Sequence, residues 1–524
     1  MMRAKNKAVL LEVGWSVLMA LVFIVINGYY FNNGDQEEHL PYVYKLLNPA
    51  LYPHDYLVPF QVNLFTVRFY FAWLLYGFAL VFPLSSVVFT LHVLCLSAVA
   101  YLIGKLTVHL TNFNESFLIA PGLTLLILNR FTVGGNNLMD VELTGSSFAF
   151  VFGLAAFYSA VIGKNKQAGI LAGIAALFQV LTGIHLLLLI SIFIFIYSNR
   201  DKFINTLHFI FFYLLIAAFI LIPILYRQFL MHNNSNTALF YTLLYQFRNA
   251  NHYLPWAFPV ADYIKTIAWW TIVLFSINTS MKGAFAKSFK AIFITIIFGC
   301  IIYNLIFYFY NYTAIGKLQW YKTTGWITVL GVIPFCNLVL SNNIVRMFFK
   351  KMKTYVDKAV IPSVIILLII ITNSFYLPAA RLQYRYQVGN YRLSDLDKMH
   401  QWIADSTPVA CVILPLPDDD GFLCRAQRSI PVGYKAIIHE PFFMIPWYQK
   451  IKMVYGIGLN DSSYSAGVLA CAADIYGTRS DAEIASSILI DYRIWDTSKC
   501  AKEMLVNKVI LHREGKYVLA QFRR

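Results

Sequence analysis

Charged residues are scarce in this chain of 524 residues, where they make up 13% of the sequence. Ordinary soluble domains carry about 25% charged residues. Hydrophobic residues make up 59% of the chain, which is more than a soluble or disordered protein carries. The composition therefore excludes both of those classes.

Several sequence signatures are also missing. The seven cysteines form no Cys-x-x-Cys pair, so we do not expect a zinc site. The sequence contains no Gly-rich nucleotide loop, no Ser-x-x-Lys and no Gly-x-Ser-x-Gly. ATP-driven transport and serine hydrolysis thus lack their usual motifs. The first apolar stretch has no small-residue cleavage site and is interpreted as a retained first span.

Long apolar stretches recur through the first 380 positions, and about 20 such residues are enough to cross a bilayer. We therefore predict an α-helical polytopic membrane protein with about 11–12 transmembrane helices. Residues 116–129, which contain Pro121, are either re-entrant or interfacial, or form a twelfth span. The eleven predicted spans are 9–30, 66–82, 86–104, 144–162, 167–181, 184–197, 204–226, 265–280, 291–310, 323–340 and 359–378.

The formal net charge of +16 predicts no nucleic-acid partner, because the excess lies in short loops between the spans. Five basic clusters hold 15 Lys and Arg against three acids. The positive-inside rule places these clusters, and the N-terminus, in the cytoplasm. An odd number of spans then places the C-terminal region outside. We expect a multi-pass protein of a bacterial cytoplasmic (inner) membrane.

The composition turns soluble near residue 380, which predicts a transmembrane domain over 1–378 and an extracytoplasmic α/β domain over 379–524. The patterns predict helices at 395–404 and 483–487, strands at 409–414 and 488–494, and a hairpin of 509–511 with 517–520. Four cysteines lie in this region, and they either pair in an oxidising compartment or stay buried and reduced. They are Cys411, Cys424, Cys471 and Cys500.

The most informative segment is the first outer loop, where acids and histidines follow directly after the first span. Asp35 stands out because Gly34 before it permits an unusual backbone turn. Carboxylates at a membrane surface can act as a general base or hold a hard divalent cation such as Mg or Mn. A solvated loop is the alternative. The further candidates in this loop are Glu37, Glu38, His39 and Asp55.

A second acidic pair, Asp140 and Glu142, precedes the span that begins at Thr144. Alternate residues of an extended segment share a face, so the pair could hold a metal ion that bridges to a phosphate. The alternative is a cap at the N-terminus of the following helix.

Three basic residues are candidates for binding a phosphate. Arg248 and His252 lie in one outer loop, where charge-assisted hydrogen bonds to a lipid phosphate are possible. An aromatic-belt loop explains their aromatic neighbours equally well. Lys317 lies at another outer interface, where snorkelling is the commoner role of a lysine.

These features together resemble the GT-C class of membrane glycosyltransferases, in its oligosaccharyltransferase-like branch. The shared features are an acid in the loop after the first span, an Asp-x-Glu near residue 140, many spans and an extracytoplasmic C-terminal α/β domain. The resemblance implies that Asp35 is catalytic, that Asp140 and Glu142 help to hold a divalent metal with Asp35, and that Arg248 binds the donor phosphate. It also implies a polyprenyl-linked sugar as donor.

The segments Asp397–Pro408 and Phe422–Lys435, together with Pro446-Trp447-Tyr448, are similar to a group of uncharacterised bacterial multi-pass membrane proteins. The Trp-Trp-Asp motif by which oligosaccharyltransferases recognise peptides is absent. The expected acceptor is therefore a glycan, a lipid or a different site on a protein.

We thus expect an enzyme that transfers a sugar or glycan from a polyprenyl-phosphate-linked donor at the outer face of the membrane. Two alternatives remain. A transporter or flippase for a lipid-linked or anionic substrate would carry charged residues deep inside its spans. A non-catalytic scaffold subunit of an envelope assembly would leave the acidic residues dispersed.

Overall fold

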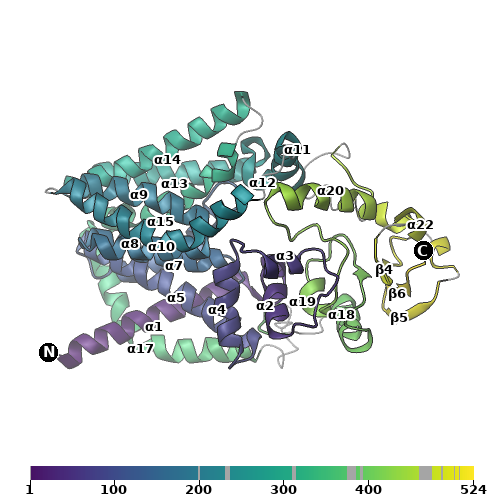
Figure 1. Ribbon diagram of the computed structural model, residues 1–524. Coiled ribbons are helices and arrows are strands. Elements are labelled where there is room, and N and C mark those ends of the chain that lie inside the picture. The colour runs from purple at the N-terminus through teal and green to yellow at the C-terminus, as the bar shows by residue number, and fades with distance from the viewer. Residues whose placement is uncertain are drawn as a thin grey trace. The chain divides into compact units, whose positions relative to one another are not determined.

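The computed structural model divides into two compact units, each built from three separate stretches of the chain (Figure 1). The helical unit comprises residues 1–29, 88–223 and 258–382, and the mixed unit comprises residues 30–87, 224–257 and 383–524. The structure describes residues 2–198, 201–230, 237–309, 314–373, 385–389, 394–459, 472, 475–484, 488–500, 502–506 and 508–523.

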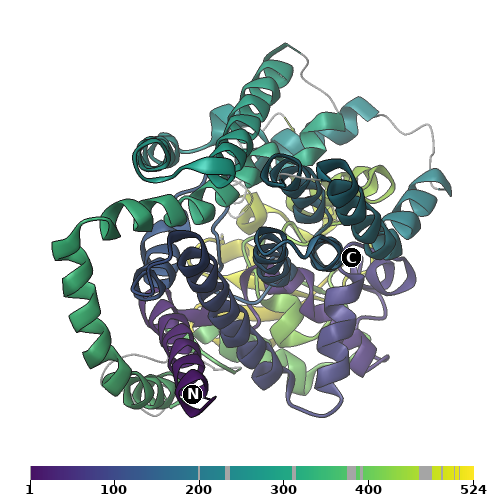
Figure 2. The ribbon, with the colours of Figure 1, turned by 90° about the vertical axis from the view of Figure 1, so that its left-hand side faces the viewer.

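Apolar helices make up the helical unit, and within the described residues eight segments are long and apolar enough to cross a membrane. This is the architecture of a polytopic membrane protein. Figure 2 shows several of these helices nearly end-on. The long helices are α1 (Met2–Asn27), α5 (Leu84–Thr111), α9 (Val180–Tyr197), α10 (Lys202–Leu230), α13 (Val260–Ser280), α14 (Gly283–Phe309), α15 and α16 (Thr324–Leu330 and Val332–Leu340) and α17 (Asn343–Thr372).

The other predicted spans correspond to shorter helices. These are α4 (Phe69–Ala79), α7 (Gly145–Val161) and α8 (Asn165–Phe178). The segment 116–129 is helical and contains Pro121 in α6 (Ser116–Gly122), followed by a π-helical turn (Leu123–Ile127) and a 3-10 turn (Leu128–Arg130). Short 3-10 helices also occur at Ala314–Leu318 and Trp320–Thr323.

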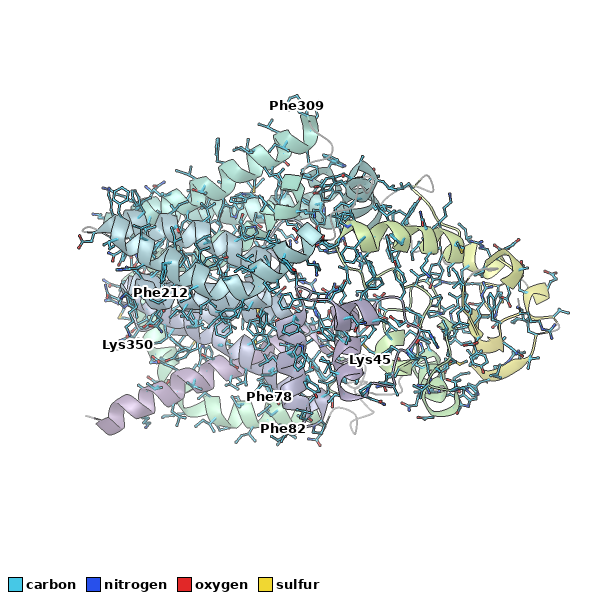
Figure 3. The ribbon with its side chains drawn as sticks, in the orientation of Figure 1. Lys45, Phe78, Phe82, Phe212, Phe309 and Lys350 are labelled. Atoms are coloured by element: carbon cyan, nitrogen blue, oxygen red, sulfur yellow. The ribbon has the colours of Figure 1, made fainter. Side chains whose placement is uncertain are left out.

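The outward faces of these helices carry large apolar side chains. Phe309 of α14 is 68% exposed, and its ring points away from the helix in Figure 3. In the most apolar part of α17 only 11% of the residues are buried inside the protein. Exposed apolar surface of this extent marks contact with another apolar phase, which for helices of this length is the lipid bilayer.

Small residues allow close packing within the helical unit. Gly169 and Gly173 lie four residues apart on α8 and face α10. A Cβ atom at Gly169 would stand 2.4 Å from the carbonyl oxygen of Phe209, and one at Gly173 would stand 2.6 Å from the Cβ of Ile216. This Gly-x-x-x-Gly spacing lets two helix backbones approach closely, as membrane helices often do.

The mixed unit contains a four-stranded sheet in the order β3-β4-β6-β5. Strand β3 pairs with β4 in parallel, and the other neighbours are antiparallel. The β5–β6 hairpin turns at Gly515 with a positive φ of 53°, as the Glu514-Gly515 pair predicted. The strands are β3 (Ile413–Leu414), β4 (Tyr492–Asp496), β5 (Ile510–Glu514) and β6 (Tyr517–Gln521).

Helices make up the rest of the mixed unit, and α18 packs against β5 and β6 of the sheet. Helix α18 begins at Asp395, as predicted, because Ser394 accepts a hydrogen bond of 3.1 Å from the backbone N–H of Asp397. The helices of the mixed unit are α2 (Leu40–Leu47), α3 (Val58–Asn63), α4, α11 (Thr237–Thr242), a π-helical turn (Leu243–Arg248), α12 (Ala250–Tyr253), α18 (Asp395–Ser406), α19 (Phe422–Ala426), α20 (Pro441–Tyr455) and α22 (Asp481–Ile484). Short 3-10 helices lie at Gly34–Glu38, Pro255–Ala257 and Lys502–Leu505, and two-residue strands at β1 (Tyr29–Tyr30) and β2 (Tyr386–Gln387).

The segment predicted to be the first outer loop is part of the hydrophobic core of the mixed unit. Tyr52 and Val58 are fully buried beside Met399 and Ile413. The hydroxyl of Tyr52 donates a hydrogen bond of 2.7 Å to the carbonyl oxygen of Leu423. This packing explains why residues 30–87 fold with the C-terminal region.

Cys411, Cys424 and Cys500 are free thiols in the part of the chain that the structure describes. Cys411 and Cys424 are buried. Cys471 lies outside the described residues. Cys411 and Cys424 thus agree with the alternative of buried, reduced thiols, whereas Cys500 is only partly buried.

Candidate functional site

Three acids of the first outer loop, Asp35, Glu37 and Glu38, lie on a short 3-10 helix, Gly34–Glu38. Gly34 adopts the positive φ of 61° that its position suggested, and the backbone N–H of Gly34 donates a hydrogen bond of 2.9 Å to Oδ1 of Asn33. This tight turn separates two carboxylates that are close in sequence. The Asp35 side chain is 63% exposed, whereas Glu37 is 5% exposed.

Asp35 lies near a lysine of the C-terminal region. The Nζ atom of Lys435 is 3.8 Å from Oδ1 of Asp35 and 3.1 Å from Oδ2 of Asp420. The lysine side chain is 22% exposed, so its charge is reachable from solvent. The arrangement combines a solvated carboxylate, which can accept a proton, with a cation that can stabilise a negative charge.

Glu37 is the buried carboxyl group of this site. Burial raises its pKa well above the usual value, and the nearby carboxylates of Asp419 and Asp420 raise it further. Lys435 and the backbone N–H of Leu423, which donates a hydrogen bond of 3.4 Å to Glu37, act in the opposite direction. A carboxyl group with a raised pKa is suited to proton transfer near neutral pH.

Glu38 forms an ion pair with the guanidinium of Arg68. Burial is the largest single effect and raises the pKa of Glu38, but the charges of Arg68, His39 and Arg248, together with the hydrogen bond from Arg68, outweigh it and the pKa is lowered. The pKa of His39 falls to about 4, because the ring is buried and lies near the same arginine. His39 is therefore neutral at physiological pH, and Glu38 has a structural partner.

Asp55 has a structural role. Its Oδ1 accepts hydrogen bonds of 2.8 and 2.9 Å from the backbone N–H groups of Leu57 and Val58 at the start of α3. Its Oδ2 accepts one of 3.0 Å from the backbone N–H of Ile430. Burial raises the pKa of Asp55 to about 6 despite these three bonds. The carboxylate thus joins the first outer loop to the C-terminal region.

Arg248 ends a π-helical turn and positions the segment that carries the lysine. Its guanidinium donates a hydrogen bond to the backbone carbonyl of Lys435 and another of 3.0 Å to Asn249. The guanidinium carbon lies 5.3 Å from the ring centre of Tyr434. His252, on the short helix α12, is partly buried.

A small cavity borders this group of charges. The cavity has a volume of about 20 Å³, which is room for about one water molecule. A carboxyl group can exchange a proton with a substrate through one water. The charged residues that line the cavity are Glu37, Asp55, Asp419, Asp420 and Lys435.

Asp140, Glu142 and Lys317 belong to the helical unit. Asn129 holds the loop that carries the two acids, because its side chain makes hydrogen bonds of 2.9 and 2.8 Å to the backbone of Met139. Glu142 is 8% exposed, and Asp140 accepts a hydrogen bond of 3.1 Å from Asn137. Thr144, rather than either acid, is the residue that caps α7. Lys317 lies on a 3-10 helix and is partly buried.

Reasoning from the sequence missed Asp419, Asp420 and Lys435. A signal was present for the two acids, because the run Asp418-Asp419-Asp420-Gly421 begins shortly after the predicted strand 409–414. Ligands in open α/β sheets bind beyond the carboxyl ends of the strands. Lys435 carries no comparable signal, since only the fold brings it to the first outer loop.

A divalent metal would need several oxygen ligands close to one another. Among the described residues, no group of three or more Asp, Glu, His or Cys side chains is close enough to hold an ion. The ammonium of Lys435 already stands beside Asp35. The metal therefore remains a proposal that concerns Asp140 and Glu142, and no chemical step below depends on it.

No protein-family model and no curated protein sequence matches this chain.

Proposed function

We propose that this protein is a membrane glycosyltransferase of the GT-C type in the bacterial inner membrane. It transfers a sugar or glycan from a polyprenyl-phosphate-linked donor to a glycan, lipid or protein acceptor at the outer face of that membrane. The eight long apolar helices support a membrane location. The observation that carries the catalytic part is the proximity of Asp35 to Lys435, at 3.8 Å.

In the proposed reaction, Asp35 accepts the proton of the acceptor hydroxyl. The oxygen of that hydroxyl forms a bond to the anomeric carbon of the donor, and the bond from this carbon to the phosphate oxygen breaks. The electron pair of the broken bond leaves with the polyprenyl phosphate. Lys435 stabilises the charge that develops on this leaving group.

Three other groups support these two residues. The guanidinium of Arg248 donates a hydrogen bond to the backbone carbonyl of Lys435 and so positions this lysine. Arg248 and His252 together are the proposed contact for the donor phosphate. Glu37 exchanges protons with the site through the adjoining cavity. Separately, in the helical unit, Asp140 and Glu142 are the residues proposed to hold a divalent metal, which would neutralise phosphate charge when bound.

The test is a turnover assay on the full chain in nanodiscs that contain a bacterial lipid extract with polyprenyl-linked sugars. Mass spectrometry measures the release of polyprenyl phosphate and the appearance of a glycosylated acceptor. Asp35→Asn should leave less than a few per cent of the activity, because loss of a general base costs roughly a hundred- to ten-thousandfold. Asp262→Asn is the matched control and should be unaffected. Asp262 is an acid at the start of α13, and its partner is Lys265.

Other results would favour the alternative functions. Movement of an intact lipid-linked substrate across a sealed vesicle, without release of polyprenyl phosphate, would identify a flippase. Equal activity of Asp35→Asn and the wild type, at equal folding, would reject the catalytic role of Asp35. Absence of both turnover and transport would favour the scaffold.

A further inference from the structure

A second, larger cavity lies at the edge of the sheet where the parallel strands β3 and β4 end. This cavity has a volume of about 150 Å³, which is enough for several water molecules. Leu416–Asp419 follow β3, Asp496 ends β4, and Lys516 and Tyr517 stand at the start of β6. This edge is where ligands bind in open α/β sheets.

The charges that line this cavity are already paired with one another. Lys516 lies 2.7 Å from Asp496, and Lys499 lies 4.0 Å from Asp418. A third carboxylate, Asp419, is hydrogen-bonded to His400 at 2.7 Å. Three carboxylates and two ammonium groups disfavour an anion. Paired charges do suit hydroxyl groups, which donate to a carboxylate and accept from an ammonium.

The aromatic lining adds a second observation. Tyr476, Trp495 and Tyr517 all border the cavity. Trp495 is 1% exposed, and its indole N–H has no hydrogen-bond acceptor among the described residues. Buried polar groups normally have a partner, so this N–H is a donor that a ligand or an ordered water would satisfy.

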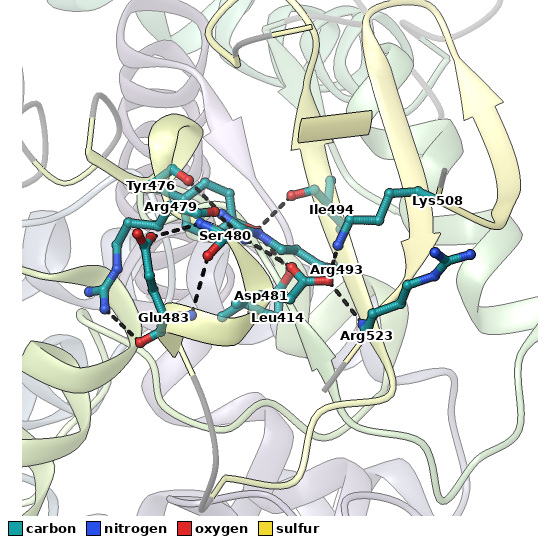
Figure 4. A network of polar contacts seen from close by, with 10 residues as sticks. All are labelled: Leu414, Tyr476, Arg479, Ser480, Asp481, Glu483, Arg493, Ile494, Lys508 and Arg523. Atoms are coloured by element: carbon teal, nitrogen blue, oxygen red, sulfur yellow. Dashed lines mark hydrogen bonds and ion pairs between the residues drawn. The ribbon is translucent and has the colours of Figure 1, made fainter. Parts of the chain in front are cut away.

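A polar network around the buried Arg493 holds two of these rings, Tyr476 and Trp495, in place, and Figure 4 shows this network with Tyr476. The guanidinium carbon of Arg493 lies 3.6 Å from the ring centre of Trp495 and 4.2 Å from that of Tyr476. Asp481 accepts a hydrogen bond of 3.1 Å from Arg493, and the hydroxyl of Tyr476 donates one of 2.7 Å to the carbonyl oxygen of Ile494. This wall of the cavity is therefore ordered before any ligand arrives, which lowers the entropic cost of binding.

We propose that the cavity bounded by Asp418, Trp495, Asp496 and Lys516 is a binding site for a neutral sugar ring. The hydroxyl groups of the sugar bind between the two ion pairs, and one of them accepts the N–H of Trp495. The cavity adjoins the one beside Glu37 and Lys435, because Leu416, Pro417 and Asp419 line both. Sugar binding here does not depend on the transferase reaction.

The experiment measures sugar binding to the full chain in nanodiscs by saturation-transfer difference NMR and titration, with empty nanodiscs as background. The probes are glucose, galactose and N-acetylglucosamine at millimolar concentrations, with glucose 6-phosphate as the anionic comparison. At least one neutral sugar should bind, and more tightly than the phosphate.

Two variants locate the binding. Asp418→Asn should weaken it by about tenfold, because a charge-assisted hydrogen bond is lost, and this exposed residue should leave folding intact. Trp495→Phe keeps the ring and removes the N–H, and should also weaken binding. Asp405→Asn on the exposed face of α18 is the control and should bind sugar as the wild type does.

Three outcomes would overturn the proposal. These are no binding of any neutral sugar by the wild type, tighter binding of the phosphate than of every neutral sugar, and equal affinity of Asp418→Asn and Asp405→Asn. Thermal unfolding of each variant distinguishes a loss of binding from a loss of structure.

Discussion

The carboxylate of Asp55 accepts a hydrogen bond from the backbone N–H of Ile430, a residue 375 positions further along the chain. The same carboxylate accepts two backbone N–H groups at the start of α3. One side chain of the first outer loop thus connects two distant parts of the mixed unit.

Asp55→Asn should destabilise the mixed unit by about 1–3 kcal/mol, because an amide cannot accept all three N–H groups and leaves one of them unsatisfied. Thermal unfolding of the purified protein, followed by tryptophan fluorescence, measures the change. The control is Asp405→Asn, at an exposed position of α18. Equal unfolding temperatures for the two variants would contradict this structural role.

The same residue predicts a pH dependence of stability. The folded-state pKa of Asp55, about 6, lies above its usual value of 3.8, so the folded state binds the proton more tightly than the unfolded state. The resulting contribution to stability is fully present below about pH 4 and is lost as the pH rises through about 6. At full effect it is on the order of 2–3 kcal/mol. The difference in unfolding free energy between the wild type and Asp55→Asn, measured from pH 4 to 7, should show this loss.

Lys435→Gln should lower the turnover number and move the acidic limb of the pH–rate profile to higher pH. Lys435 lowers the pKa of Glu37, so removal of the ammonium raises that pKa further and Glu37 keeps its proton to a higher pH. Lys452→Gln, at an exposed position of α20, is the matched control. If turnover falls but the pH–rate profile does not change, Lys435 stabilises the leaving group and its effect on the pKa of Glu37 has no part in turnover.

Arg248→Ala should weaken donor affinity by about ten- to a hundredfold, the effect of losing a charge-assisted hydrogen bond. Titration of the purified variant with a polyprenyl phosphate measures it. Arg248→Lys separates two roles, because lysine keeps the charge but cannot reproduce the forked contacts to Lys435 and Asn249. Unchanged affinity in both variants would assign Arg248 to structure alone.

A reporter fused after Arg524 that is active only in the cytoplasm should be silent. The positive-inside rule predicts that the five basic clusters are cytoplasmic, and the predicted odd number of spans then puts the C-terminal region outside. A second fusion in the basic loop between α13 and α14 should be active and serves as the control. Strong activity of the C-terminal fusion would reverse the orientation and remove the proposed site from the outer face.

The sequence by itself determined the features that depend on local composition. Apolar runs near 20 residues predicted the long helices, because their length alone satisfies the requirement for crossing a bilayer. The hairpin at Glu514-Gly515 and the start of α18 after Ser394 follow from turn and capping preferences of neighbouring residues. The turn at Gly34 is local in the same sense, since only the freedom of glycine to adopt a positive φ is involved.

Only the tertiary structure decided which acids differ in their chemistry. Asp35 and Glu37 share one 3-10 helix, yet the first is exposed and the second is buried beside Asp419 and Lys435. Their environments depend on side chains that arrive from the far end of the chain when residues 51–58 pack into the core of the C-terminal region. Burial and long-range charge set these properties, and neither is encoded in the spacing of neighbouring residues.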